Sequence, residues 1–211
     1  MNIHQLRLYF GEGLLGTLGE QHRKQRKMIN PVFSPKHLQE MVPIFYNVTY
    51  KLRDAILAQV KAGPQEIDMV HWFGRTALEL IGQSGIGYSF DNLDEGPPHP
   101  YSLAVKSLVP TVTRLQALLP LLPYVSELGT PAFRRALVER IPSEDVQNVR
   151  RIVDMMEEVS RDIVHSKQRN NGDASGQVGA GKDIMSILLR ANREAIQEDR
   201  LTDSEVIAQV T

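Results

Sequence analysis

Apolar residues recur at every third or fourth position along two long stretches of this chain, and this spacing constrains its fold more than any other feature. Over residues 143–168, one helix face would carry Val146, Val149, Val153, Met156, Val159 and Ile163. Over residues 34–61, the same spacing relates Leu38, Met41, Phe45, Val48, Leu52 and Ile56. No stretch shows a convincing strand-length alternation of apolar and polar residues. The sequence therefore predicts an all-α fold.

Residues at the expected ends of these stretches support the helices. Ser34 and Pro35 are typical of the N-cap and the first position of a helix, while Pro43 should bend the same helix because it cannot donate a backbone hydrogen bond. A further helix is predicted over 67–82, with one stripe formed by Ile67, Val70, Ala77 and Ile81. Weaker patterns predict helices over 101–109 and 131–141, and a short helix is predicted over 182–194.

The last residues of the chain specify a helix start. Thr202 and Glu205 match a capping box, and Leu201 and Val206 can pack as a hydrophobic staple around it. The chain then stops at Thr211, little more than two turns later. Two interpretations follow: a longer helix that is cut off, or a short terminal helix docked on the core.

Composition excludes several classes of protein. The 24 Lys and Arg residues nearly balance the 25 Asp and Glu residues, and aromatic residues make up only 6%, so we expect no nucleic-acid partner. The sequence has no cysteine, which excludes disulfides and a thiolate ligand within these residues, and its six histidines lack zinc-site spacing. No apolar run approaches the roughly 20 residues of a membrane span, and the N-terminus lacks the layout of a signal peptide.

A cationic segment near the N-terminus is the strongest candidate for a binding site. Between His22 and His37 the chain carries five Lys and Arg residues and no acidic residue. His22 and Arg26 are four positions apart, so on a helix both side chains project from one face. Two such donors suit an anionic ligand such as a pair of carboxylates. A solvated helix face would explain the same charges.

The sequence around these residues resembles the cytochrome P-450 family of haem-thiolate monooxygenases, particularly its long-chain fungal members. Residues 11–45 read GEGLLGTLGEQHRKQRKMINPVFSPKHLQEMVPIF, which is similar to the family's C helix and the start of its D helix. Residues 67–90 are similar to the E helix and its glycine-aromatic exit, although many relatives have Asp where Glu79 stands. The remaining matches keep the family's order, with the F region in 101–109, the G helix in 143–168, the H helix in 182–192 and the start of the I helix at 201–205.

The resemblance implies roles for individual residues. His22 and Arg26 would contact the haem propionates, because the family's C helix carries an aromatic residue or His followed four positions later by Arg. Arg23 and Lys27, each one position further along, would contact a reductase that delivers electrons from NADPH. Residues 101–125 would form part of the wall of a pocket for an apolar substrate, although ordinary core packing would equally explain the leucines at 118, 119, 121 and 122.

The resemblance also implies what these residues leave out. The oxygen-activating stretch of the I helix would begin just beyond Thr211, and the Cys-bearing haem loop, the sheet regions and an N-terminal membrane anchor would lie elsewhere in the parent protein. We therefore expect residues 1–211 to be one partial cytochrome P-450-like domain, all-α and truncated at both ends, with a flexible loop at 169–181. The parent would be a haem-dependent enzyme of the endoplasmic reticulum membrane that inserts one oxygen atom from dioxygen into an apolar substrate. This chain alone would be inactive.

A second interpretation needs no cofactor. A small helical adaptor protein could use the basic stretch 22–37 to bind an acidic partner. The two interpretations differ in what a reading frame extended past Thr211 should encode: the family's oxygen-activating stretch and a Cys-bearing loop, or neither.

Overall fold

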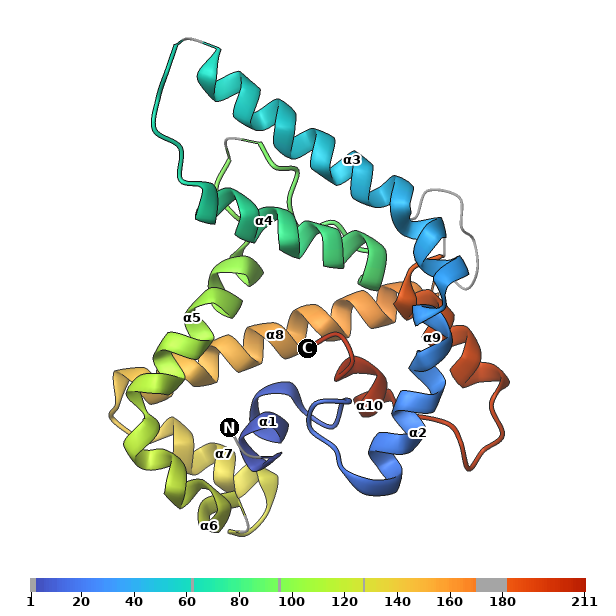
Figure 1. Ribbon diagram of the computed structural model, residues 1–211. Helices are drawn as coiled ribbons and strands as arrows, with labels where there is room; N and C mark the ends of the chain where they lie inside the picture. The colour runs from blue at the N-terminus through green and yellow to red at the C-terminus, as the bar shows by residue number, and fades with distance from the viewer. Residues whose placement is uncertain (1–2, 62, 95, 127, 170–181) are drawn as a thin grey trace. The chain divides into compact units, whose positions relative to one another are not determined.

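The computed structural model describes residues 3–61, 63–94, 96–126, 128–169 and 182–211. Every regular element in these residues is a helix and none is a strand (Figure 1), so the all-α prediction is confirmed. The chain divides into two compact units. The first combines residues 1–25, 103–162 and 201–211, and the second combines residues 26–102 and 163–200.

The first unit is built from eight elements or parts of elements. They are α1 (Ile3–Phe10), α2 (Gly19–Ile29) up to Gln25, α5 (Pro100–Arg114) from Leu103, η3 (Gln116–Leu121), α6 (Leu122–Ser126), α7 (Pro131–Glu139), α8 (Glu144–Arg169) up to Asp162, and α10 (Asp203–Ile207). Met156 is 1% exposed, as the periodicity of 143–168 predicts. Arg135 of α7 joins the outer side of α8 through a bidentate ion pair with Asp154, at 2.5 and 2.6 Å.

The second unit contains η1 (Asn30–Phe33), α3 (Pro35–Val60), α4 (Met69–Ile81), a π-helical turn η2 (Gly82–Ile86) and α9 (Ile184–Glu194). It also contains the end of α2, the start of α5 and the end of α8. Helices α3 and α4 lie side by side (Figure 1) and enclose a small core. That core consists of Val48, Leu52, Trp72 and Leu93.

The start of α3 agrees with its sequence signals. The Ser34 side chain accepts a hydrogen bond of 3.4 Å from the backbone N–H of His37, and Pro35 is the first helical residue. The helix continues through Pro43 to Val60. Met41, Val48 and Leu52 of the predicted face are buried.

Helix α4 buries a different face from the one its apolar stripe suggests. Its buried residues are Trp72, Arg75, Thr76 and Glu79, whereas Val70 is 82% exposed and Ile81 is 62% exposed. Trp72 packs in the small core of the second unit, and the buried polar residues of this face have specific partners. Ile67, the first residue of the predicted stripe, precedes the helix.

Those partners follow α4 in the sequence. Arg75 donates two hydrogen bonds of 2.6 Å to the Asp91 carboxylate, with both side chains almost fully buried. One carboxylate oxygen of Glu79 accepts hydrogen bonds from the backbone N–H groups of Phe90 and Asp91, at 2.7 and 2.8 Å. These bonds provide partners for charges that would otherwise be costly to bury, and they hold residues 90 and 91 against α4.

The ends of α8 and α9 meet in the second unit through one buried ion pair. Asp183 caps α9 by accepting a hydrogen bond of 2.9 Å from the backbone N–H of Ser186. Its other oxygen accepts from the ammonium of Lys167 at 3.1 Å. Arg169 is the last residue of α8, and residues 170–181 of the predicted flexible loop 169–181 lie outside the described residues.

Among the described residues, no single helix is long and apolar enough to cross a membrane. One bent pair, Pro100–Arg114 followed by Gln116–Val125, passes the same test of length and hydropathy only when its two helices are taken together, and they meet at 75°.

Candidate functional site

Helix α2 carries the cationic residues that the sequence singled out. Glu20 lies in its first turn and Arg26 and Lys27 lie in its last, which complements the helix dipole. The sequence GEQHRKQRKMI is polar almost throughout, and Gln25 is its one buried residue. The helix is therefore held by hydrogen bonds of particular side chains rather than by an apolar face.

His22 is half-buried, and the residue that anchors it lies in the preceding loop. Its Nδ1 lies 3.1 Å from the carbonyl oxygen of Leu14. Because a carbonyl only accepts, Nδ1 carries the proton in this contact. Nε2 is the ring nitrogen that remains for a further contact.

Arg26 follows His22 by one turn of the same continuous helix, and its side chain is exposed. Among the described residues, its guanidinium has no hydrogen-bond or ion-pair partner. The neighbouring cations are also exposed: Arg23 lies 3.8 Å from Glu20 in a loose pair, and Lys27 pairs with no described residue. Arg26 is thus available to an anion that the described residues do not supply.

Gln25 fixes α2 in the first unit through four hydrogen bonds, and sequence reasoning did not single it out. Its Nε2 donates to the carbonyl of Glu12 at 2.8 Å and to Glu205 Oε1 at 3.1 Å. Its Oε1 accepts from Thr17 Oγ1 and Gln209 Nε2, both at 3.2 Å. Both donor hydrogens and both acceptor sites of the amide are satisfied, although the side chain is fully buried.

Glu205 completes the capping box that the sequence predicted at the start of α10. Its Oε2 accepts hydrogen bonds of 2.8 and 3.0 Å from the backbone N–H and hydroxyl of Thr202, and its Oε1 accepts from Gln21 and Gln25 of α2. Burial raises the pKa of the Glu205 carboxyl, but these hydrogen bonds outweigh burial and hold the pKa below its ordinary value. The capping residue therefore also connects α10 to α2.

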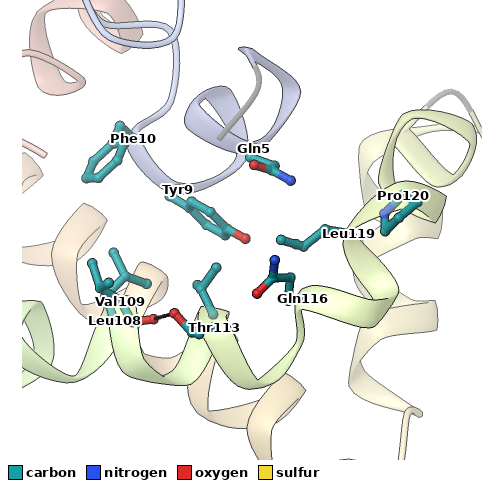
Figure 2. Close-up of a pocket in the computed structure, with 10 residues that line it drawn as sticks. Gln5, Tyr9, Phe10, Leu108, Val109, Thr113, Gln116, Leu119 and Pro120 are labelled. Atoms are coloured by element: carbon teal, nitrogen blue, oxygen red, sulfur yellow. Dashed lines mark hydrogen bonds between the residues drawn. The ribbon is translucent and has the colours of Figure 1, made fainter.

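A cavity of about 510 Å³ lies beside α1, α5 and η3 within the first unit. Figure 2 shows its lining side chains converging from these three elements. Most of them are apolar, and the polar ones are Gln5, Tyr9, Thr113 and Gln116. This volume lies within the range of pockets that bind small organic molecules.

The cavity includes part of the segment expected to form a substrate wall. Leu119 and Pro120 line it, while Leu118 and Leu121 are more than half exposed. The leucines in this proline-interrupted segment therefore do not all line the cavity. No periodic pattern in α1 predicted that this helix supplies the opposite wall, because it is only eight residues long.

No cluster of three or more His, Cys, Asp or Glu side chains in the described residues could hold a metal ion. The 211-residue sequence has no cysteine, so these residues supply no thiolate for an iron centre. The donors on α2 have the chemistry to hold carboxylates.

Comparison with known proteins finds similarity to one family. The cytochrome P-450 family model matches residues 2–211. Cytochrome P-450 monooxygenase 81 of Postia placenta is 51% identical over 208 residues, which cover 97% of this chain and 38% of that protein. A ganoderic acid synthetase of Ganoderma lucidum is 39% identical over 210 residues, which cover 97% of this chain and 38% of that protein.

A crystal structure of a cytochrome P-450 shows the same fold. It matches with a TM-score of 0.67 at 19% sequence identity, covering 99% of this chain and 42% of the solved one. The chain thus spans about two fifths of the length of the proteins that it matches.

Proposed function

Because the chain belongs to the cytochrome P-450 family, we propose that it supplies the haem-propionate contacts and part of the substrate cavity of a haem-dependent monooxygenase. Haem, when bound, supplies the iron at which dioxygen is split, one oxygen atom being inserted into substrate and the other reduced to water with electrons from NADPH through a reductase. The substrate class is an apolar small molecule.

One observation carries the assignment of the cofactor contacts. Arg26 projects from α2 without a partner among the described residues, one turn after a histidine whose position is fixed by the Leu14 carbonyl. A guanidinium presents a planar fork that matches a carboxylate, and the imidazole of His22 lies one turn away on the same helix. We assign the main propionate contact to Arg26 and a supporting contact to His22.

The buried hydrogen bonds of Gln25 support this assignment. Gln25 lies between His22 and Arg26 in the sequence and is the buried residue of α2. Its bonds to Glu12, Thr17, Glu205 and Gln209 fix the rotation of the helix at that point. Because the rotation of the helix is already fixed, the helix loses no further conformational freedom when its cationic side chains bind a ligand.

The exposed cations Arg23 and Lys27 are assigned to a reductase. Neither is held by a strong ion pair, since Arg23 is 80% exposed beside Glu20 and Lys27 pairs with no described residue. Exposed charges of this kind attract an acidic partner and speed its association.

The test is a carbon monoxide difference spectrum after reduction with dithionite. The 211-residue chain, incubated with haem, should give no thiolate-type band because it contains no cysteine. A chimaera in which this chain replaces the matching 208 residues of the Postia placenta monooxygenase should give that band. A chimaera that folds but binds no haem would contradict the proposal.

A further inference from the structure

Two hydroxyl residues of the sequence, Ser34 and Thr130, are followed directly by proline. Proline-directed protein kinases act on this dipeptide, and they bind the acceptor segment in an extended conformation. Proline favours that conformation in the residue before it. Thr130 has it, with a φ of −82° and a ψ of 159°. The sequence and the backbone at Thr130 therefore both suit a kinase substrate, which the proposed function does not use.

The Thr130 hydroxyl is accessible and free to react. Thr130 lies in the connection between α6 and α7 and is exposed, as are Gly129 and Pro131 on either side, whereas Ser34 is half-buried. Its Oγ1 accepts a hydrogen bond of 3.3 Å from the backbone N–H of Phe133. Among the described residues, nothing accepts the hydroxyl proton. Oγ1 can therefore lose this proton without breaking a hydrogen bond that it donates.

A guanidinium is held beside this hydroxyl. Nη1 of Arg134 donates hydrogen bonds of 3.3 and 2.9 Å to the backbone carbonyls of Leu128 and Gly129. The Gly129 carbonyl belongs to the peptide bond that ends at Thr130, so the guanidinium lies next to the hydroxyl-bearing residue. Nε and Nη2 of Arg134 have no partner among the described residues. A guanidinium with spare donors matches the oxygens of a phosphate group.

We infer that Thr130 is a phosphorylation site for a proline-directed protein kinase and that Arg134 binds the phosphate. In the reaction Oγ1 attacks the γ-phosphorus of ATP, the bond from that phosphorus to ADP breaks, and the hydroxyl proton passes to the base of the kinase. The product carries a charge of about −1.5 to −2 at pH 7. Arg134 offers Nε and Nη2 to it, and the first turn of α7 contains no acidic residue that would repel it.

Phosphorylation of the 211-residue chain tests the acceptor. The chain is incubated with ATP and a recombinant mitogen-activated protein kinase, and mass spectrometry of its peptides gives the initial rate at each residue. Thr130 should react about tenfold faster than Ser34, because the half-buried Ser34 must first be exposed by local opening. Thr130→Val should remove the faster reaction and leave the rate at Ser34 unchanged. Equal rates at the two residues, or no phosphate at Thr130, would overturn the inference.

A phosphorus NMR titration of the phosphorylated chain tests the contact with Arg134. A bound guanidinium favours the dianion, so the second pKa of the phosphate should lie below that of a synthetic phosphopeptide of residues 128–140. Arg134→Ala should raise this pKa to the peptide value, and Arg134→Lys, which keeps the charge, should raise it only in part. Arg140→Ala removes an exposed cation at the end of α7 and should leave it unchanged.

Two results of the titration would overturn the inference. One is the same phosphate pKa in the chain and in the peptide, which would mean that the fold places no cation at the phosphate. The other is an equal effect of Arg134→Ala and Arg140→Ala, which would mean that only the net charge of the chain acts on the phosphate.

Discussion

Gln25 of α2 donates a hydrogen bond of 3.1 Å to Glu205 at the start of α10, across 180 residues of sequence. Glu205 also closes its own capping box with Thr202. One carboxylate therefore defines where α10 begins and how α2 is held in the first unit. Substitutions at Glu205 should affect both helices.

Glu205→Gln should destabilise the chain by about 1–3 kcal/mol. Both carboxylate oxygens accept hydrogen bonds, so an amide would place a donor opposite either the Thr202 donors or the two glutamine donors. Urea unfolding at pH 7 measures the change. Glu66→Gln is the matched control, because Glu66 is exposed and should shift stability by less than about 0.5 kcal/mol. Equal effects of the two substitutions would contradict the role of Glu205.

The same carboxylate should make stability depend on pH. Its folded-state pKa is lowered, so its stabilising contribution is present above the unfolded-state value of about 4.3 and is lost as the pH falls through the lower folded-state value. The stability difference between the unsubstituted chain and Glu205→Gln should therefore narrow below about pH 4. Urea unfolding of both proteins between pH 3 and 7 provides the test. A difference in unfolding free energy that does not change with pH would mean that the ionised form of Glu205 is not what stabilises the chain.

Periodicity predicted the helices better than it predicted which faces they bury. Helix α8 buries Met156 and Ile163 of the predicted face. Helix α4 instead buries Arg75 and Glu79, since the following segment supplies their partners, the Asp91 carboxylate and the backbone N–H groups of residues 90 and 91. A pattern within one helix carries no information about such partners.

The candidate site shows the same limit. His22 and Arg26 were found because their four-residue spacing is local to one helix. Gln25 was not, because its partners Glu205 and Gln209 lie at the far end of the sequence. The capping-box signal did identify Glu205, but only in its local role. Helix α1 had no signal as a cavity wall, since the cavity is formed only together with α5 and η3.

Asp91→Asn should destabilise the chain by roughly 3–5 kcal/mol, because it leaves the buried Arg75 guanidinium without its counter-ion. Asp94→Asn is the matched control. Asp94 lies 3.9 Å from Arg75 but is 67% exposed, so its loss should cost less than about 1 kcal/mol. Chemical denaturation of both variants at pH 7 measures the two changes. Comparable losses would mean that the bidentate pair does not stabilise the second unit as described.

The Arg23 and Lys27 assignment predicts a salt-dependent effect on electron transfer. In the Postia placenta chimaera, reversing both charges to Glu should slow reduction by the reductase mainly at low ionic strength, because exposed charges act on association more than on the bound complex. Stopped-flow reduction over a range of salt concentrations gives the rates. Reversal of Lys51 and Lys61, two exposed lysines outside α2, controls for net charge. The assignment would be wrong if both double variants slowed reduction equally.

Arg26→Ala should lower haem retention by the chimaera by one to two orders of magnitude. A charge-assisted hydrogen bond contributes about 1.5–3 kcal/mol, and each 1.4 kcal/mol corresponds to a factor of ten. Arg26→Lys should recover only part of the loss, because an ammonium lacks the planar fork of a guanidinium. His22→Ala should cost less, because one ring nitrogen of His22 already contacts the Leu14 carbonyl and only the other remains for the propionate.

Haem occupancy of these three variants, measured after gel filtration against increasing concentrations of a haem-scavenging apoprotein, separates a propionate contact from a surface charge. Arg23→Ala is the control for loss of a cation on the same helix, and it should retain haem like the unsubstituted chimaera. On a solvated face, Arg26 and Arg23 would be equivalent and both substitutions would be nearly neutral. Equal retention by Arg26→Ala and Arg23→Ala would therefore remove Arg26 from the cofactor site, whereas the order Arg26→Ala below Arg26→Lys below His22→Ala would support the guanidinium as the main contact.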